Sequence, residues 1–175
     1  NNNGGTWNKT LGFRTTWIFG FAFRYTNLIY NMINQWFVGL YSPLSRYRLC
    51  GLKINPDGSI SIVRFDPYPS STPEFILGTT DIALNDNEWY YVEFKCELAT
   101  AISAGGCSVR VNGVEQLSLA AGTRTAPQYV LGGYIISANS FRLGASNPGT
   151  QGSQWFDDLY VCDTGIIPTT PAANP

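Results

Sequence analysis

Short runs in which apolar and polar positions alternate occupy most of the chain. Because successive residues of a β-strand point to opposite faces, such a run predicts a strand with one buried face. The first run is "WIFGFAFRY", in which every second residue is aromatic: Trp17, Phe19, Phe21, Phe23 and Tyr25. No segment has a convincing helical period, so the pattern predicts strands and no helices.

Two turn motifs predict hairpins between these strands. "NPDG" at 55–58 has Pro and Gly where a β-turn favours them, and Asn112-Gly113 is a dipeptide typical of two-residue hairpin loops.

The clearest alternation is "WYYVEFKCEL" at 89–98, with Glu93 and Glu97 on the polar face. About ten short strands with turns between them predict an all-β antiparallel sandwich.

Proline marks the segments outside the strands. "DPYPSSTPE" at 66–74 has three prolines and is expected to be an exposed loop. "GIIPTTPAANP" at the end has no capacity for a core of its own. We therefore expect an N-terminal extension over 1–12, one domain over 13–165, and a Pro-rich tail over 166–175 that is disordered or lies on a partner.

Composition narrows the classes of function. The formal net charge is −1, from 11 basic and 12 acidic residues, which gives no electrostatic preference for nucleic acid or an anionic membrane. There is no histidine, and this excludes zinc hydrolysis, a Ser-His-Asp triad and a Cys-His dyad within the chain. No apolar run approaches the ~18 residues of a membrane helix, and the start, "NNNGGTWNKT", lacks the segments of a signal peptide. We expect no cofactor and no metal.

Four cysteines, Cys50, Cys96, Cys107 and Cys162, lie in or beside apolar runs. Without a C-x-x-C pair they predict neither a zinc site nor a thioredoxin-like site, and we interpret them as buried free thiols. A symmetric hairpin would place Cys96 and Cys107 nearly opposite each other, within bridging distance.

Several motifs resemble those of a known fold family. "EWYYVEFKCEL" followed by "CSVRVNGVEQ" resembles the central hairpins of concanavalin A-like and laminin G-like jelly rolls. "FRLGAS" and "WFDDLYVCDTG" are similar to the penultimate and last strands of that fold, and "FDDLYVCDTG" is most similar to the version in structural proteins of tailed bacteriophages. The resemblance covers roughly residues 13–165 and implies an antiparallel jelly-roll β-sandwich.

The doublet Asp157-Asp158 stands inside this last strand. If Leu159 and Val161 face the core, alternation places Asp157 on the same face. A buried carboxylate needs hydrogen-bond partners, so we interpret Asp157 as a structural cap of backbone N–H groups, in preference to a calcium ligand or a catalytic acid.

Few residues suggest a catalytic site, a calcium site or a sugar-binding site. Glu93 and Glu97 lack the central Asp of the E-x-D-x-E motif found in fold-related glucanases, so we expect no enzyme. "DIALNDNEW" offers the oxygen donors Asp81, Asn85, Asp86 and Asn87 for calcium, although a solvated turn explains them as well. Tyr68 in the Pro-rich loop could contact a sugar.

The resemblance and the low charge together predict a non-enzymatic virion structural protein. The preferred role is that of a capsid decoration or cement protein assembled in the host cytoplasm. We still expect free thiols at Cys96 and Cys107, because virion proteins assemble in the reducing cytoplasm of the host. The expected partners are further copies of the chain, as a trimer at a capsid threefold, and the major capsid or other virion proteins. Ile166, Ile167 and Pro168 would contact the partner, since a neighbouring subunit could bury the two isoleucines. The alternatives are a carbohydrate-binding, lectin-like module and a tail-fibre or receptor-binding domain.

Overall fold

The computed structural model describes residues 7–26, 36–41, 48–65, 74–99, 105–119, 125, 138–144 and 153–162. These residues form eleven strands: β1 (Trp7–Arg14), β2 (Thr16–Thr26), β3 (Trp36–Tyr41), β4 (Arg48–Ile54), β5 (Ser59–Phe65), β6 (Glu74–Ala83), β7 (Tyr90–Glu97), β8 (Gly106–Val111), β9 (Val114–Leu119), β10 (Ala138–Leu143) and β11 (Ser153–Cys162). The described residues include no helix, and thus none that could cross a membrane. The prediction of an all-β fold is confirmed.

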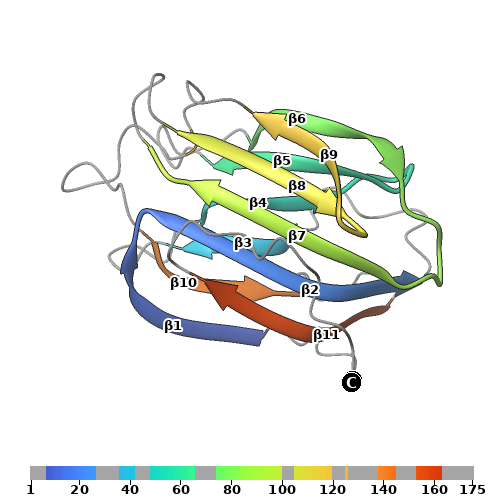
Figure 1. Cartoon of the computed structure of the whole chain (residues 1–175), viewed down its shortest axis with the longest axis horizontal. Coiled ribbons are helices and arrows are strands. Elements are labelled where there is room, and N and C mark those ends of the chain that lie inside the picture. Colours follow the sequence, from blue (N-terminus) through green and yellow to red (C-terminus); the bar gives the residue numbers. More distant parts are fainter. Residues whose placement is uncertain are drawn as a thin grey trace.

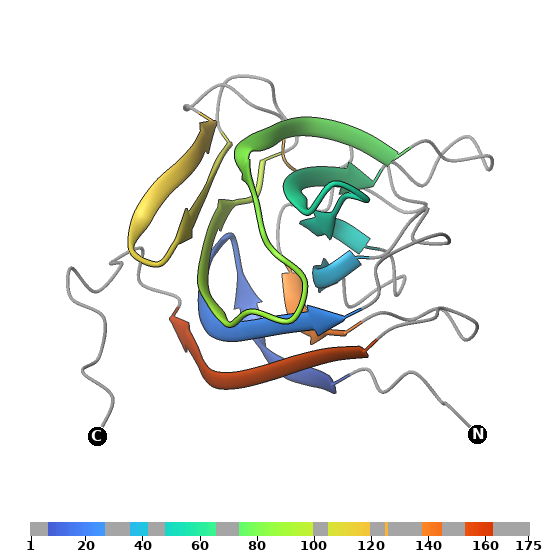
Figure 2. The same cartoon turned by 90° about the vertical axis from the view of Figure 1, so that its right-hand side faces the viewer.

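The strands form two antiparallel sheets that pack face to face. One sheet has six strands in the order β1-β10-β3-β4-β5-β6, and the other has five in the order β11-β2-β7-β8-β9. In Figure 1 the five-stranded sheet lies in front of the six-stranded sheet. Figure 2 shows that long strands such as β6 and β11 bend around the space between the sheets.

Aromatic side chains of β2 fill the middle of the core. Trp17, Phe19, Phe21 and Phe23 are fully buried, as their alternation predicts. They meet aromatic rings of the other sheet: the Phe19 ring lies 4.9 Å from that of Phe141, centroid to centroid, and the Phe23 ring lies 4.6 Å from that of Phe37. Each such pair joins the two layers by apolar burial and ring contact.

Both predicted hairpin turns are present. The amide of Gly58 donates to the carbonyl of Asn55 across 2.9 Å, and Gly58 has a φ of +86°, which glycine adopts without strain. Asn112 and Gly113 have φ values of 51° and 80°, as a type I′ turn requires at its two central positions. These turns set the registers of β4 with β5 and of β8 with β9.

The sandwich begins earlier in the chain than the sequence predicts. β1 starts at Trp7 and pairs with β10, so residues 7–12 belong to the sheet and not to an extension. β1 lies at the edge of its sheet, where a strand needs fewer apolar residues, and its sequence "WNKTLGFR" lacks a clear alternation. Glu74, the last residue of the loop predicted over 66–74, begins β6. Residues 66–73 and residues 166–175, with Ile166, Ile167 and Pro168, lie outside the described residues, so the predictions made for them are not tested.

Candidate functional site

The strand β11 determines which acids face solvent. Asp157 pairs with Ala22 and Tyr160 with Gly20, so Asp158 and Leu159 together oppose one residue of β2 in a β-bulge. The bulge reverses the alternation, and Phe156 and Leu159 both pack against the core. The prediction of an inward Asp157 is therefore wrong, because its side chain is exposed. Its Oδ1 accepts the backbone N–H of Asp158 at 2.9 Å, within the bulge itself.

The same strand carries one member of a row of three side chains on the outer face of the five-stranded sheet. Trp155 of β11 pairs directly with Arg24 of β2. On the other side of β2, Phe23 pairs with Tyr90, which places Trp89 beside Arg24. The guanidinium carbon of Arg24 lies 4.4 Å from the ring centroid of Trp155 and 5.1 Å from that of Trp89. We call Trp155, Arg24 and Trp89 the tryptophan row.

The tryptophan row is accessible and cationic. Trp89 is 48% exposed and Trp155 is 37% exposed, whereas most aromatic side chains of β2 are fully buried. The Nε of Arg24 is buried and has no hydrogen-bond partner among the described residues. Contact with both rings holds the guanidinium in place by cation–π attraction. The row can thus offer aromatic surface and a positive charge together.

An acid close to the row is already engaged. The Oε2 of Glu88 accepts hydrogen bonds from the Tyr90 hydroxyl at 2.7 Å and from the Asn85 amide at 3.1 Å. These bonds lower the pKa of Glu88, so the carboxylate is satisfied within its own turn. This turn contains three of the four proposed calcium donors, Asn85, Asp86 and Asn87, whereas Asp81 lies in β6. Among the described residues, the only cluster of three or more His, Cys, Asp or Glu side chains close enough to share a metal ion consists of cysteines.

Further along the same face, Tyr160 covers β2. Its hydroxyl donates to Oε1 of Glu93 at 2.8 Å, and its ring stacks near that of Tyr91 at 6.4 Å between centroids. Burial, followed by the bond to Glu93, raises the pKa of Tyr160 well above the ordinary value. Glu93 lies on the outer face, as its position in the strand predicts, yet it is only 8% exposed. Its carboxylate is thus held in a structural contact.

A pocket opens beside the tryptophan row, at the edge of the sandwich. It has a volume of about 380 Å³, and it is lined by Trp7, Leu143, Phe156, Asp157, Asp158 and Leu159. Trp7 is 47% exposed, so an aromatic ring and two carboxylates meet in the same hollow. The pocket and the row are joined through β11, because Trp155 and Asp157 are two residues apart on the same strand.

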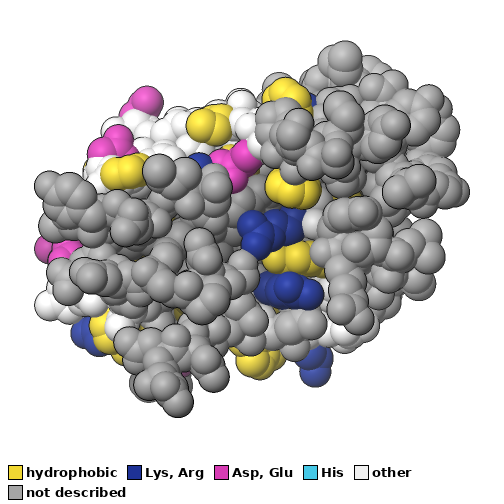
Figure 3. All heavy atoms as spheres, turned by 180° about the vertical axis from the view of Figure 1, so that it is seen from behind, with side chains coloured by type: hydrophobic (Ala, Val, Ile, Leu, Met, Phe, Trp, Pro, Cys, Tyr) yellow, Lys and Arg dark blue, Asp and Glu magenta, His cyan; other side chains and the backbone are white. Residues whose placement is uncertain are grey.

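The outer face of the six-stranded sheet carries a second group of basic and aromatic residues. Figure 3 shows Lys and Arg side chains gathered with hydrophobic ones near the middle of this face. Here the guanidinium carbon of Arg142 lies 4.1 Å from the ring centroid of Tyr41, and the Nε of Arg48 donates to the Tyr41 hydroxyl at 3.0 Å. Because Tyr41 is only 6% exposed, its ring is a packing surface and not a platform for a ligand.

Comparisons with known proteins agree with this architecture. No family model and no curated protein sequence matches the chain. Among solved structures, the heptameric SAP-like pentraxin of Limulus polyphemus is 12% identical, with a TM-score of 0.57, over 97% of this chain and 74% of the pentraxin. The fold is a concanavalin A-like jelly roll.

Two enzymes share the fold. The PL-14 alginate lyase of Aplysia kurodai is 13% identical, with a TM-score of 0.58, over 86% of this chain and 70% of the lyase. The NanB sialidase of Streptococcus pneumoniae is 15% identical, with a TM-score of 0.58, over 98% of this chain but only 28% of the sialidase. At these identities the likeness establishes the fold alone.

Sequence reasoning did not identify the tryptophan row. Its members stand at 24, 89 and 155, and only the strand register brings them together. A signal was available in Arg24, the single charged residue in the apolar run of β2. Tyr68, the residue that the sequence offered for a sugar, lies outside the described residues.

Proposed function

We propose that the protein is a carbohydrate-binding, lectin-like domain and that the tryptophan row is its binding surface. The observation that carries this proposal is the exposure of two tryptophans on either side of one arginine on a sheet. Exposed indole rings can stack on the apolar face of a sugar ring, and a sheet holds them at a fixed spacing. Two proteins with the same fold, an alginate lyase and a sialidase, are named for carbohydrate substrates, and this supports the proposal of carbohydrate binding.

Arg24 points to the class of saccharide. A guanidinium recognises a carboxylate through paired N–H donors, and no carboxylate among the described residues pairs with Arg24 in an ion pair. Asp157, which lies two residues beyond Trp155 on β11 and pairs with Ala22, can accept hydrogen bonds from sugar hydroxyls. These groups together favour an oligosaccharide that carries a uronic or sialic acid over a neutral one.

A glycan array with neutral and acidic oligosaccharides tests this proposal. We expect binding to acidic glycans, and we expect the double variant Trp89→Ala with Trp155→Ala to lose it by at least about tenfold, since each lost ring contact is worth about 1 kcal/mol. Phe75→Ala is the matched control, because Phe75 is an exposed aromatic residue, 38% accessible, on the other sheet. A wild-type protein that binds no glycan, or a double variant that binds as tightly as wild type, would refute the assignment.

We further propose that the domain binds sugars without cleaving them. The chain has no histidine, and the carboxylate of Glu93 is held by Tyr160 instead of facing a partner acid. Two carboxylates at a set separation across the bond are what glycoside hydrolysis requires. Incubation with any glycan found on the array, followed by mass analysis of the products, tests this point, and cleavage at a catalytic rate would contradict it.

The virion setting is a separate proposal that rests on the "FDDLYVCDTG" motif. In that setting the domain would be a decoration protein on a phage capsid, assembled as a homotrimer, with Ile166, Ile167 and Pro168 in contact with a neighbouring subunit or the major capsid protein. A truncation after Asp163 tests the contact, with the mass in solution and the occupancy on purified particles as readouts. Full decoration by the truncated chain would remove the role of the tail. Glycan binding by the domain would be unaffected in either case.

A further inference from the structure

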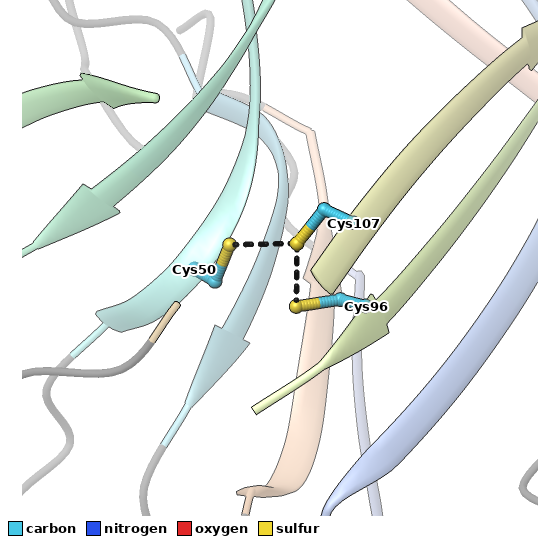
Figure 4. A group of neighbouring side chains, drawn as sticks. All are labelled: Cys50, Cys96 and Cys107. Atoms are coloured by element: carbon cyan, nitrogen blue, oxygen red, sulfur yellow. Dashed lines mark hydrogen bonds between the residues drawn. The ribbon is translucent and has the colours of Figure 1, made fainter. Parts of the chain in front are cut away.

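Three of the four cysteines meet inside the core. Cys50 comes from β4 of the six-stranded sheet, and Cys96 and Cys107 come from β7 and β8 of the five-stranded sheet. All three side chains are buried, and Figure 4 shows their sulfur atoms pointing toward one another across the space between the sheets. The fourth, Cys162, is half-buried on β11.

Cys96 and Cys107 have the closest contact. They are direct partners in the register of β7 with β8, as the symmetric hairpin predicts, and their Sγ atoms are 3.1 Å apart. Direct partners in an antiparallel pair have Cα atoms about 4.5–5.5 Å apart, within the range found in disulfides. An S–S bond measures about 2.05 Å, so the two sulfur atoms must approach by only about 1 Å.

The spacing fits a disulfide better than a metal ion. Thiolates that share one zinc or copper ion at about 2.3 Å lie roughly 3.8–4.0 Å apart, which is farther than the Sγ atoms of Cys96 and Cys107. The Sγ of Cys50 lies 3.9 Å from that of Cys107, which is within this range, so it is the short contact between Cys96 and Cys107 that departs from the geometry of a metal site. Three thiolates in an apolar core would also bear a large desolvation cost, whereas a disulfide is neutral.

We propose that Cys96 and Cys107 are a redox-responsive pair, present as free thiols in a reducing medium and as a cross-strand disulfide in an oxidising one. The oxidant is a low-molecular-weight disulfide of the glutathione type. The thiolate of Cys107 attacks it, forms a mixed disulfide and releases one thiol. The thiolate of Cys96 then attacks the Cys107 sulfur and releases the second thiol. The two cysteines lose two protons and two electrons, and the oxidant is reduced to two thiols.

The position of the pair determines when the bond forms. Burial raises the pKa values of Cys96 and Cys107, so the reactive thiolates are scarce while the sandwich is closed. The pair lies one residue from the end of β7 and one from the start of β8, and a hairpin forms before distant strands assemble. Oxidation is therefore fast during folding and slow in the native protein.

Thiol counting after refolding tests the proposal. The denatured, reduced protein is refolded once in reduced glutathione alone and once in a mixture of oxidised and reduced glutathione, then denatured and alkylated without reductant. We expect four alkylated cysteines in the first sample. In the second we expect two, a mass lower by two hydrogen atoms before alkylation, and one peptide pair joined through Cys96 and Cys107.

Two serine variants identify the partners. Cys50→Ser should still form the bond, which leaves Cys162 as its one reactive thiol. Cys107→Ser should keep all three of its thiols. Four reactive thiols in the wild-type protein after oxidative refolding would overturn the proposal. A bond mapped to Cys50 would also overturn it, as would zinc or copper retained at one ion per chain after dialysis. The wild-type peptide map decides the question even if a variant fails to fold.

Discussion

At the scale of single residues, Gly20 explains how Tyr160 can lie flat on the sheet. A Cβ atom at Gly20 would stand 2.0 Å from Cε1 of Tyr160. The ring therefore needs a glycine beneath it, and its hydroxyl then reaches Glu93. The sequence alone does not explain why β2 has a glycine at position 20. Tyr160 lies 140 positions away in the chain and reaches β2 only through the pairing of β11.

We predict that Gly20→Ala lowers the free energy of unfolding by about 1–3 kcal/mol, since the ring must move and break its bond to Glu93. Urea unfolding measures the change. Tyr160→Phe is the control, because it keeps the ring and removes only the hydroxyl. Its loss should be smaller than that of Gly20→Ala, and an unchanged stability in Gly20→Ala would show that the contact is not formed.

Tyr25 gives a prediction for alkaline pH. Burial, followed by the nearby charge of Asp86, raises the pKa of Tyr25 to about 12. The folded state thus holds this proton more tightly than the unfolded state, whose tyrosine pKa is about 10. The resulting stability is fully present below pH 10 and is lost as the pH rises toward 12.

We expect the free energy of unfolding to fall across this interval, with roughly 1–2 kcal/mol due to Tyr25 after allowance for solvent screening. In Tyr25→Phe the fall should be shallower by that amount, although this variant also loses the hydrogen bond to the carbonyl of Leu84. Unfolding curves at several pH values between 9 and 12 provide the comparison. Equal slopes in the two proteins would rule out Tyr25 as the group responsible.

At the scale of elements, the strands that alternate strongly were predictable and the irregular ones were not. β2, β7 and both hairpin turns follow directly from residue periodicity and turn chemistry. β1 was missed because an edge strand tolerates polar residues on both faces. The predicted inward orientation of Asp157 was wrong because a β-bulge adds one residue to β11, and strict alternation cannot anticipate such an insertion.

The bulge itself can be tested at Asp158, which has a φ of +49°. This left-handed conformation is disfavoured for β-branched residues and easy for glycine. We predict that Asp158→Gly is neutral or stabilises the protein by a few tenths of a kcal/mol, while Asp158→Val destabilises it by about 1–2 kcal/mol. Thermal unfolding of both variants gives the answer. Equal melting temperatures for Gly and Val at this position would mean that the strand has no bulge.

At the scale of the whole molecule, pairing between distant strands creates both the core and the candidate site. Phe141 of β10 contacts Trp17 and Phe19 of the facing sheet, with ring centroids 6.4 Å and 4.9 Å apart. The tryptophan row likewise combines residues from β2 and β11 with Trp89, the residue that precedes β7. Composition and periodicity predicted the two-sheet fold, but register depends on packing across the sandwich and cannot be taken from a single sequence.

We predict that Phe141→Ala destabilises the protein by about 3–5 kcal/mol, because it leaves a cavity where the two sheets meet. Val114→Ala is the matched control, since Val114 is 61% exposed at the start of β9 and should change stability by less than about 0.5 kcal/mol. Chemical denaturation measures both. A loss below about 1 kcal/mol for Phe141→Ala would contradict the central place of this residue in the core.

The central claim is that the outer face of the five-stranded sheet binds an acidic glycan. Indole N–H signals in nuclear magnetic resonance spectra test it most directly, because the chain has five tryptophans that single substitutions can assign. On titration with an acidic oligosaccharide, we predict that the signals of Trp89 and Trp155 shift together, while that of Trp17, which is fully buried, stays in place. Shifts confined to Trp7 would place the ligand in the edge pocket instead, and an absence of shifts at Trp89 and Trp155 at saturating glycan would contradict the account.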